Sequence, residues 1–339
     1  MRSSRLSVLT LVAALALSFC GCAPTAPVED PPERPEISAR PEASPPPELL
    51  QAAKAPDDWT PPLLPKRRYA AGFHRIGNSI YVFGGKTGGR SEENRFAYRI
   101  DRGETEWRQI ASIPDRHDYR GSVVIDGKIY TVGPAILRYN SDVDRWVPIK
   151  VNVPIPRSHF FAAALGREIY QVGGLPRNLG VMKIYNLDDD TLRAGPELPE
   201  FRGGDHFIIL ATLDGSIHAI GGIGHGSREI EKQHFRLVNG VWETRAPHPT
   251  GVTGKFTAWT VHEGRLFTFE REGFVYDPET DTWTALATPP RMRVLPALIP
   301  LDDTLVMLGG LEPQEQKNEG WKYFVREDRW EEIPPPESE

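Results

Sequence analysis

The acidic stretch YDPETDTW, residues 276–283, is the first candidate for chemistry in this sequence. Its three carboxylates alternate along the chain and could bind a cation such as Ca²⁺, but a calcium loop needs more converging oxygen ligands than one short hairpin supplies. Acidic residues are also typical of tight turns. Because NSDVDR (140–145) and NLDDDT (186–191) occupy the same place in other parts of the chain, we favour a turn that belongs to the architecture. The expected turn residues are Asp277, Glu279 and Asp281.

Histidines form the second candidate group, since six of the nine fall between residues 206 and 262. They are His206, His218, His225, His234, His248 and His262. Their spacing matches no known metal motif, and a histidine on a strand usually satisfies a local hydrogen bond. The glycine-rich GGIGHG at 221–226 opens no helix, which argues against a phosphate-binding loop. We therefore expect no metal and no cofactor.

Short apolar strands that end in glycine recur along the chain. They read IYVFGG, IYTVGP, IYQVGG, IHAIGG, LFTFER and LVMLGG, and the second residue of each is called here the head: Tyr81, Tyr130, Tyr170, His218, Phe267 and Val306. Successive heads lie 39 to 49 residues apart. A turn and another apolar stretch precede each head, and an aromatic residue followed by tryptophan usually comes after it. Four antiparallel strands in a repeat of this length predict one propeller blade.

These residues resemble the kelch motif, in which a double glycine follows an apolar strand and an aromatic residue precedes a tryptophan at a fixed distance. The resemblance covers about residues 66–336 and implies an all-β fold, a six-bladed kelch-type β-propeller with four antiparallel strands per blade. The glycines are expected where backbone is crowded or needs a positive φ angle. The expected structural residues are Gly84, Gly85, Gly173, Gly174, Gly221, Gly222, Gly309, Gly310, Trp107, Trp146, Trp242, Trp283 and Trp330.

The tryptophan of a repeat, or the residue in its place, and the residues that follow it are called here the tail. One irregularity is that the chain has seven tails for six heads. Trp59 precedes the first head by 22 residues, and WTPPLLP resembles WTALATPP of a later repeat. An N-terminal strand can complete the last blade of a closed ring, so residues 59–64 compete with 330–333 for its outer edge. We favour packing of residues 59–64 beside that closure.

The N-terminus has the features of an export signal. Two arginines precede an apolar run that is too short for a comfortable transmembrane span, and small residues follow. The end of the run resembles a bacterial lipobox, which implies removal of residues 1–21 and lipidation of Cys22, although Phe19 and Cys20 depart from the usual pattern. Ordinary secretion is the alternative. Either lipidation or cleavage near this point leaves a folded domain without cysteine, which excludes disulfides and thiolate chemistry there.

A proline-rich and acidic stretch separates this signal from the repeats. Residues 22–58 are expected to form a lipidated, extended and disordered tether, and residues 59–339 the propeller. The formal net charge is −6 over 339 residues, with no polybasic cluster. We therefore expect no nucleic-acid partner and membrane contact only through the lipid. The expected location is the bacterial cell envelope, and we expect a monomer.

Cations recur shortly before the heads of all six repeats. They are Arg68, Arg120, Arg157, Arg202, Lys255 and Arg293, and three of them lie 13 residues before a head. In the kelch domains of eukaryotic adaptors, arginines at this place bind acidic peptides, so the resemblance implies a ligand-binding rim with Arg68, Arg157 and Arg293. The alternative is that these arginines pair with neighbouring acidic residues of the loops.

Three functions remain open from the sequence. The favoured one is a non-catalytic envelope module that binds an anionic protein or glycan at the cationic rim. The second is an enzyme similar to the bacterial kelch sialic-acid mutarotases, with His225, Glu229 and Glu231 as places to look for acid–base groups. The third is a structural envelope scaffold. We find no diagnostic catalytic motif, so an enzyme is the less favoured interpretation.

Overall fold

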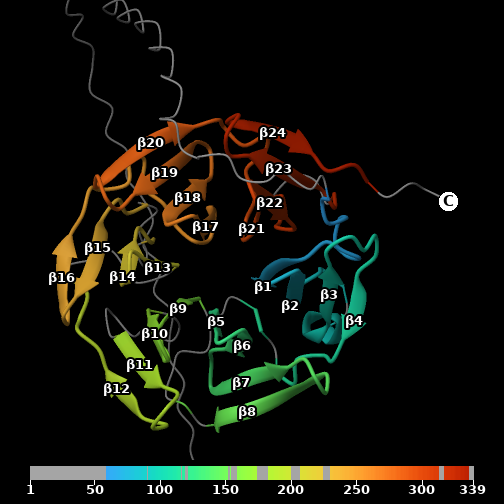
Figure 1. The fold of residues 1–339 in the computed structure, drawn as a ribbon, viewed down its shortest axis with the longest axis horizontal. Helices are drawn as coiled ribbons and strands as arrows, with labels where there is room; N and C mark the ends of the chain where they lie inside the picture. The colour runs from blue at the N-terminus through green and yellow to red at the C-terminus, as the bar shows by residue number, and fades with distance from the viewer. Residues whose placement is uncertain are drawn as a thin grey trace, which may run out of the picture. The chain divides into compact units, whose positions relative to one another are not determined.

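Six four-stranded antiparallel sheets make up the folded part of the chain, each built from four consecutive strands. The computed structural model describes residues 59–89, 91–115, 117–118, 121–151, 153, 159–173, 182–199, 207–223, 230–312 and 317–335. Within this unit the sheets are arranged as blades around a central channel (Figure 1). The predicted all-β, six-bladed kelch-type propeller is confirmed. No helix among the described residues is long and apolar enough to cross a membrane.

The innermost strand of each blade comes first in the sequence and the outermost comes last. Blade one holds β1 (Tyr69–Ile76), β2 (Ser79–Lys86), β3 (Ala97–Asp101) and β4 (Arg108–Ile110), with the 3-10 helix η1 (Ser91–Arg95) before β3. Blade two holds β5 (Ser122–Ile125), β6 (Lys128–Thr131), β7 (Ala135–Asn140) and β8 (Arg145–Val151). Blade three holds β9 (Phe161–Leu165), β10 (Glu168–Val172), β11 (Met182–Asn186) and β12 (Leu192–Ala194). Blade four holds β13 (Ile209–Leu213), β14 (Ser216–Ile220), β15 (His234–Val238) and β16 (Val241–Thr244). Blade five holds β17 (Ala258–His262), β18 (Arg265–Phe269), β19 (Gly273–Asp277) and β20 (Thr282–Leu286). Blade six holds β21 (Ala297–Leu301), β22 (Thr304–Leu308), β23 (Gly320–Phe324) and β24 (Arg329–Glu332).

The first two strands of each blade are joined by a two-residue turn, as the sequence predicts. In blade four the turn is Asp214–Gly215, with φ angles of 45° and 72°. Positive φ at both central residues defines the type I′ turn, whose twist matches that of the flanking strands. Asp and Gly tolerate this conformation, so the short polar dipeptides seen in the sequence fix the register of each inner hairpin.

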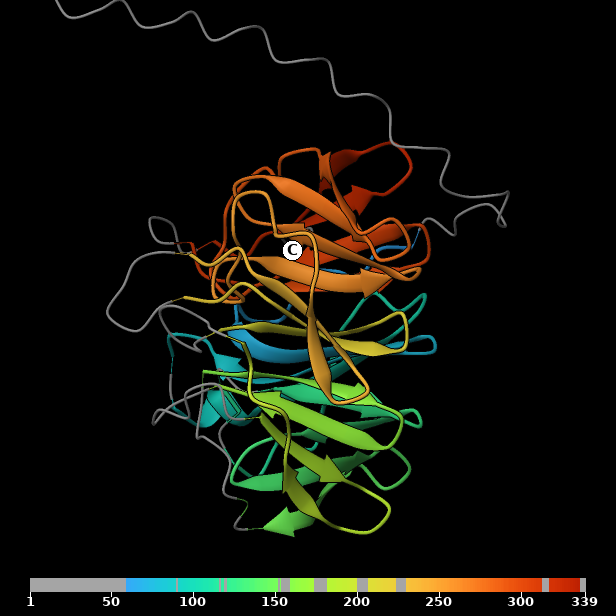
Figure 2. The same ribbon diagram turned by 90° about the vertical axis from the view of Figure 1, so that its left-hand side faces the viewer.

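The hydrophobic core is divided among the interfaces between neighbouring blades. One cluster of buried side chains lies between each consecutive pair, including the pair formed by blades six and one. The sheets are stacked face to face around the ring when seen from the side (Figure 2). Trp146 of blade two packs against Phe83 of blade one, and Trp330 of blade six packs against Phe269 of blade five. The expected role of these tryptophans between adjacent sheets is thus seen directly.

The glycine pairs form backbone junctions between blades. In blade one, Gly84 and Gly85 have φ angles of 67° and 78°, and the N–H of Gly85 donates to the carbonyl of His117 in the approach to blade two, at 2.7 Å. A Cβ atom on Gly84 would lie 2.3 Å from that same carbonyl oxygen. The pairs in blades four and six make equivalent contacts, through Gly221–Gly222 and Gly309–Gly310. Gly173 also has a positive φ, and Gly174 lies outside the described residues.

Ring closure uses the N-terminal segment without adding a strand. Blade six is completed by β24, and residues 59–64 pack beside it, as favoured from the sequence. Trp107 of blade one donates its indole N–H to the carbonyl of Pro62 at 3.0 Å, while Asn318 of blade six donates to the carbonyl of Leu64 at 2.7 Å. Leu64 is buried in the core shared by blades six and one. In other blades the corresponding indole N–H donates to a carbonyl in the tail of the preceding blade. Blade one comes first in the sequence, so residues 59–64 supply this acceptor for Trp107.

Candidate functional site

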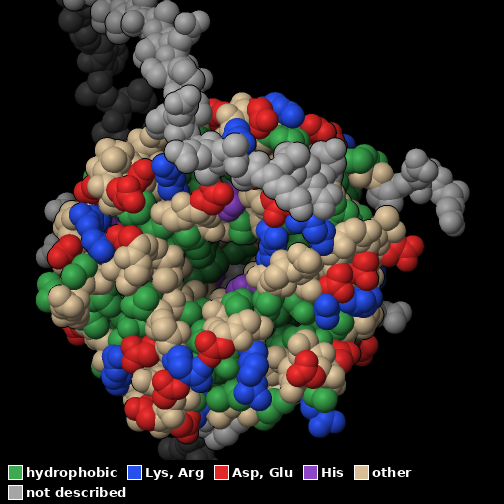
Figure 3. Space-filling model, viewed as in Figure 1, with side chains coloured by type: hydrophobic (Ala, Val, Ile, Leu, Met, Phe, Trp, Pro, Cys, Tyr) green, Lys and Arg blue, Asp and Glu red, His purple; other side chains and the backbone are tan. Residues whose placement is uncertain are grey.

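A cavity of about 260 Å³ lies in the channel at the centre of the ring. Its walls come from the inner strands β1, β5, β9, β17 and β21, and many of the lining residues are small or aromatic. The space-filling view shows a central hollow with hydrophobic side chains on its walls (Figure 3). Phe161 and Trp259 meet edge to face within the wall, with ring centroids 5.8 Å apart. A concave and largely apolar pocket with a few polar groups is the default place for a ligand.

Four residues at the channel mouth share an unusual backbone conformation. Ala70, His159, Phe207 and Leu295 have φ angles of 55°, 67°, 58° and 54°. Each stands 11 residues before the head of its blade, so the conformation repeats in register. None is a glycine, and bulky side chains are strained in this region of φ. Because the same backbone strain recurs around one opening, contacts with the surrounding structure must stabilise it.

Backbone hydrogen bonds tie these mouth residues together across several blades. Gly254 N–H donates to the Phe207 carbonyl at 2.8 Å, Leu295 N–H donates to the Lys255 carbonyl at 2.8 Å, and Ala70 N–H donates to the Leu295 carbonyl at 3.3 Å. The side chains of Ala70, Phe207 and Leu295 also form one buried apolar cluster, although they come from blades one, four and six. These bonds cross-link the mouth segments of blades one, four, five and six. No motif in the sequence predicts these cross-links, because the residues that form them are of ordinary types.

The two described arginines of the expected rim lie inside the blades. Arg68 is 1% exposed, and its Nη1 donates to the carbonyls of Gly84 and Phe96. Arg293 is 2% exposed, donates to the Gly309 carbonyl at 3.0 Å and forms a 3.0 Å ion pair with Glu319. A ligand would reach neither guanidinium without displacing these contacts. Burial therefore argues against both side chains as ligand-binding groups: Arg293 pairs with an acidic residue, as the alternative expects, whereas Arg68 is held by backbone carbonyls. Arg157, which shares their spacing, lies outside the described residues, as do Arg120 and Arg202.

Of the expected rim residues that the structure describes, Lys255 lies at the channel mouth. Its ammonium group lies 5.1 Å from the ring centroid of Phe256 and 6.0 Å from that of Phe207. The side chain is half-buried, and within the described ranges it forms no ion pair with a carboxylate. A cation over aromatic faces can accept an anionic group without first breaking a salt bridge.

Few polar side chains line the cavity, and His74, Ser122 and Thr257 among them make hydrogen bonds to other side chains. His74 Nε2 lies 2.9 Å from Ser122 Oγ, and burial lowers the pKa of His74 to about 4, so its imidazole is neutral at pH 7. On the other wall Thr257 Oγ1 donates to Glu270 Oε2 at 2.9 Å. Burial raises the pKa of Glu270, while the Thr257 hydrogen bond opposes this shift. The walls can exchange hydrogen bonds with a ligand but present no fixed positive charge.

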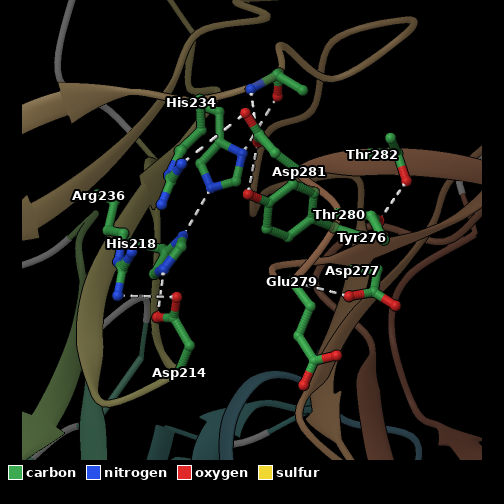
Figure 4. A network of polar contacts seen from close by, with 12 residues as sticks. Asp214, His218, His234, Arg236, Tyr276, Asp277, Glu279, Thr280, Asp281 and Thr282 are labelled. Carbon is green, nitrogen blue, oxygen red and sulfur yellow. Dashed lines mark hydrogen bonds and ion pairs between the residues drawn. The ribbon is translucent and has the colours of Figure 1, made fainter.

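The acidic hairpin at residues 276–283 is architectural, as predicted. Asp281 accepts the Tyr276 hydroxyl at 2.8 Å and the backbone N–H of Ala246, in the tail of blade four, at 2.9 Å (Figure 4). Asp277 accepts the backbone N–H of Glu279 at 2.9 Å within the turn. The equivalent aspartates of blades two, three and six hold the tyrosine hydroxyls of their own blades in the same way. These carboxylates bind the chain itself.

Two of the clustered histidines form a buried polar chain in blade four (Figure 4). Asp214 Oδ1 lies 3.0 Å from His218 Nε2, His218 Nδ1 lies 2.8 Å from His234 Nε2, and His234 Nδ1 lies 3.2 Å from the Ala246 carbonyl. A carbonyl only accepts, so His234 carries its proton on Nδ1 and His218 donates to His234 Nε2. Burial lowers the pKa of His218, and the nearby Asp214 carboxylate opposes that shift.

No group of three or more His, Cys, Asp or Glu side chains within the described parts of the chain is placed to bind a metal ion. Among the residues proposed for acid–base chemistry, His225 and Glu229 lie outside the described residues. Glu231 is described, and its backbone bonds to Gly222 and Val252 within the blade-four loop. Cys22 also lies outside the described residues.

Comparisons with known proteins agree with this architecture. No protein-family model matches the chain. Kelch-like protein 34 from Homo sapiens is 28% identical over 226 residues, which are 61% of this chain and 34% of that protein. Kelch-like protein 15 from Danio rerio is 25% identical over 218 residues, which are 55% of this chain and 35% of that protein. The Kelch repeat and BTB domain-containing protein 1 of Camelpox virus is 24% identical over 234 residues, which are 61% of this chain and 40% of that protein.

The similarity thus spans only about a third of the length of the first two relatives. Among solved structures, that of YjhT superposes with a TM-score of 0.67 and 14% sequence identity, and covers 81% of this chain and 99% of that one. Identity this low shows a shared fold and leaves the site to be argued from its own residues.

Proposed function

The chain is a kelch-repeat β-propeller, and from this premise we propose that it is a non-catalytic binding module whose partner docks over the channel mouth. The observation that carries the proposal is the set of cross-linked mouth residues, Ala70, His159, Phe207 and Leu295. A surface fixed before binding loses little conformational entropy on association. Its central hollow gives a partner side chain a place to insert.

The proposed partner is an anionic protein or glycan. Lys255 supports this assignment, since its ammonium group lies beside the aromatic rings at the mouth and has no competing carboxylate among the described residues. The buried Arg68 and Arg293 take no part in this version of the site. Their role is to hold the loops on which the mouth depends.

A charge reversal at Lys255 tests this proposal. Lys128, exposed at the start of β6, provides a matched control for the same change in net charge. Envelope extract is passed over the immobilised full chain as wild type, Lys255→Glu and Lys128→Glu. A partner retained by the wild type and by Lys128→Glu, but lost or weakened at least tenfold with Lys255→Glu, supports the site. Equal retention by all three would remove Lys255 and the mouth from the proposal.

The proposed setting is the bacterial cell envelope, with a lipid on Cys22 and residues 22–58 as the tether. The support for this comes from the lipobox-like sequence and the proline-rich stretch alone. Metabolic labelling with palmitate should mark the wild type, and the Cys22→Ala protein should be unlabelled and leave the membrane fraction. Continued sedimentation of unlabelled Cys22→Ala with membranes would exclude the anchor while leaving the binding test unaffected.

A further inference from the structure

Blade five departs from the repeat at the place where other blades carry the glycine pair. The strand pairing aligns Phe269 with Phe83, so Glu270 and Arg271 take the positions of Gly84 and Gly85. The N–H of Glu270 donates to the Glu272 carbonyl at 3.1 Å, and among the described residues Arg271 makes no backbone bond to the next blade of the kind that Gly85 makes to His117. The chain turns back at once, and only residues 270–272 join β18 to β19.

The loop that leads into blade five is also different. Phe256 occupies the register of the mouth residues with positive φ, but it does not share their conformation. The N–H groups of Phe256 and Thr257 both donate to the Thr253 carbonyl at 3.0 Å, which makes a tight turn there. Both loops of this blade are therefore remodelled on the face that carries the channel mouth.

These two changes leave a second pocket beside the central cavity. Its volume is about 620 Å³, and its walls include Ile230, Thr250, Phe256, Glu270 and Met292. Arg271 and Glu272 are exposed at its edge, and their charges offset one another. The net charge of the pocket is thus that of Glu270.

Glu270 is a half-buried carboxyl group with little to compensate its charge. One oxygen accepts the Thr257 hydroxyl, and in the described part of the chain Glu270 has no ion-pair partner. Burial penalises a carboxylate and raises the pKa of this one, while the Thr257 hydrogen bond and the charge of the exposed Arg271 act in the opposite direction. A cation brought in by a ligand would relieve that penalty.

We propose that this pocket binds an alkylammonium group. Glu270 receives the ammonium, while Ile230, Phe256 and Met292 supply an apolar wall for the attached methylene chain. Phe256 already has the ammonium of Lys255 within 5.1 Å of its ring, so this ring accepts such a contact. The proposal goes beyond the mouth site, since it concerns a different cavity and a cationic rather than an anionic ligand.

The test is a calorimetric or NMR titration of the full chain with n-butylamine, with n-butanol as the uncharged control. Butylamine should bind, and butanol should bind at least tenfold more weakly. Glu270→Gln keeps an acceptor for Thr257 and should weaken butylamine at least tenfold, whereas Glu272→Gln, which removes an exposed charge at the same edge, should change it less than twofold. Equal affinity for amine and alcohol, an unaffected Glu270→Gln variant, or no binding at all would overturn the proposal.

Two additions make the result independent of folding and identify the source of the ammonium. Glu270→Asp keeps the charge and should retain more affinity than Glu270→Gln, while a loss common to both with a lowered Tm would count against a charge-specific site.

Nα-acetyl-lysine N-methylamide is titrated alongside butylamine. Binding of both ligands admits lysine side chains of proteins, and binding of butylamine alone restricts the pocket to free amines. Lys255→Glu, which tests the mouth, should leave butylamine bound, so failure of one site is separable from failure of the other.

Discussion

His218 Nδ1 lies 2.8 Å from His234 Nε2 in the interior of blade four, and Asp214 and Ala246 complete the chain at its two ends. Replacing either histidine by leucine leaves its neighbour with an unmet polar group. We expect His218→Leu to lower the free energy of unfolding by about 2–4 kcal/mol. In a double-mutant cycle with His234→Leu, the two losses should overlap by about 1–3 kcal/mol. Urea unfolding measures both values, and additivity within about 0.3 kcal/mol would show that the histidines do not act together.

Buried histidines predict a loss of stability in acid. Burial lowers the pKa of His234 and of His248 to about 3, whereas the unfolded chain titrates near pH 6.5. The unfolded state therefore takes up protons first as the pH falls. Stability is fully present above about pH 6.5 and declines below it, by about 1.4 kcal/mol per pH unit for each such histidine. Urea midpoints from pH 7.5 to 4.5 should fall less steeply for His248→Gln than for the wild type; identical slopes would contradict the assignment.

Glycine substitutions should separate conformational strain from crowding. Gly84 and Gly77 both have a positive φ, at 67° and 58°, but a Cβ on Gly84 would meet the His117 carbonyl, whereas one on Gly77 would meet open space. Gly77→Ala is expected to cost about 1–2 kcal/mol from backbone conformation alone. Gly84→Ala should cost at least about 2 kcal/mol more, because the junction between two blades must shift. Thermal unfolding of the two variants provides the comparison, and equal losses would argue against a role in blade contact.

Arginine substitutions distinguish the buried guanidinium groups from those at the surface. Arg293→Met removes the cation 3.0 Å from Glu319 and the donor to the Gly309 carbonyl, so we expect a loss of about 3–5 kcal/mol. Arg291→Met also removes a cation, which lies 3.1 Å from Glu312 and 3.9 Å from Glu319, but this side chain is 39% exposed, and a loss of about 0–1 kcal/mol is expected. Denaturant midpoints compare the pair. A small effect at Arg293 would return that residue to the candidates for ligand binding.

The repeat made the architecture predictable, because each blade uses the same few contacts. Tyr276 and Asp281 recur in register with their counterparts, and their spacing in the sequence is the spacing of one hairpin. The channel mouth was not predictable, since the positive φ of Phe207 or Leu295 is imposed by neighbouring blades and leaves no mark in residue type. Arg68 and Arg293 were placed in the correct loops, but their burial depends on contacts with Gly84 and Gly309 that only the folded blade creates. Glu270 could have been noticed as the departure from glycine in LFTFER.

The position of the N-terminal segment decides how the ring responds to force. Tension along the chain before Trp59 passes first to the contacts of residues 59–64, which bond to both blade one and blade six. The two blades are also joined there by the ion pairs of Asp302 with Arg75 and Arg102. A pull on the N-terminal chain is therefore borne by the contact between the first and last blades before it reaches the strands of blade one.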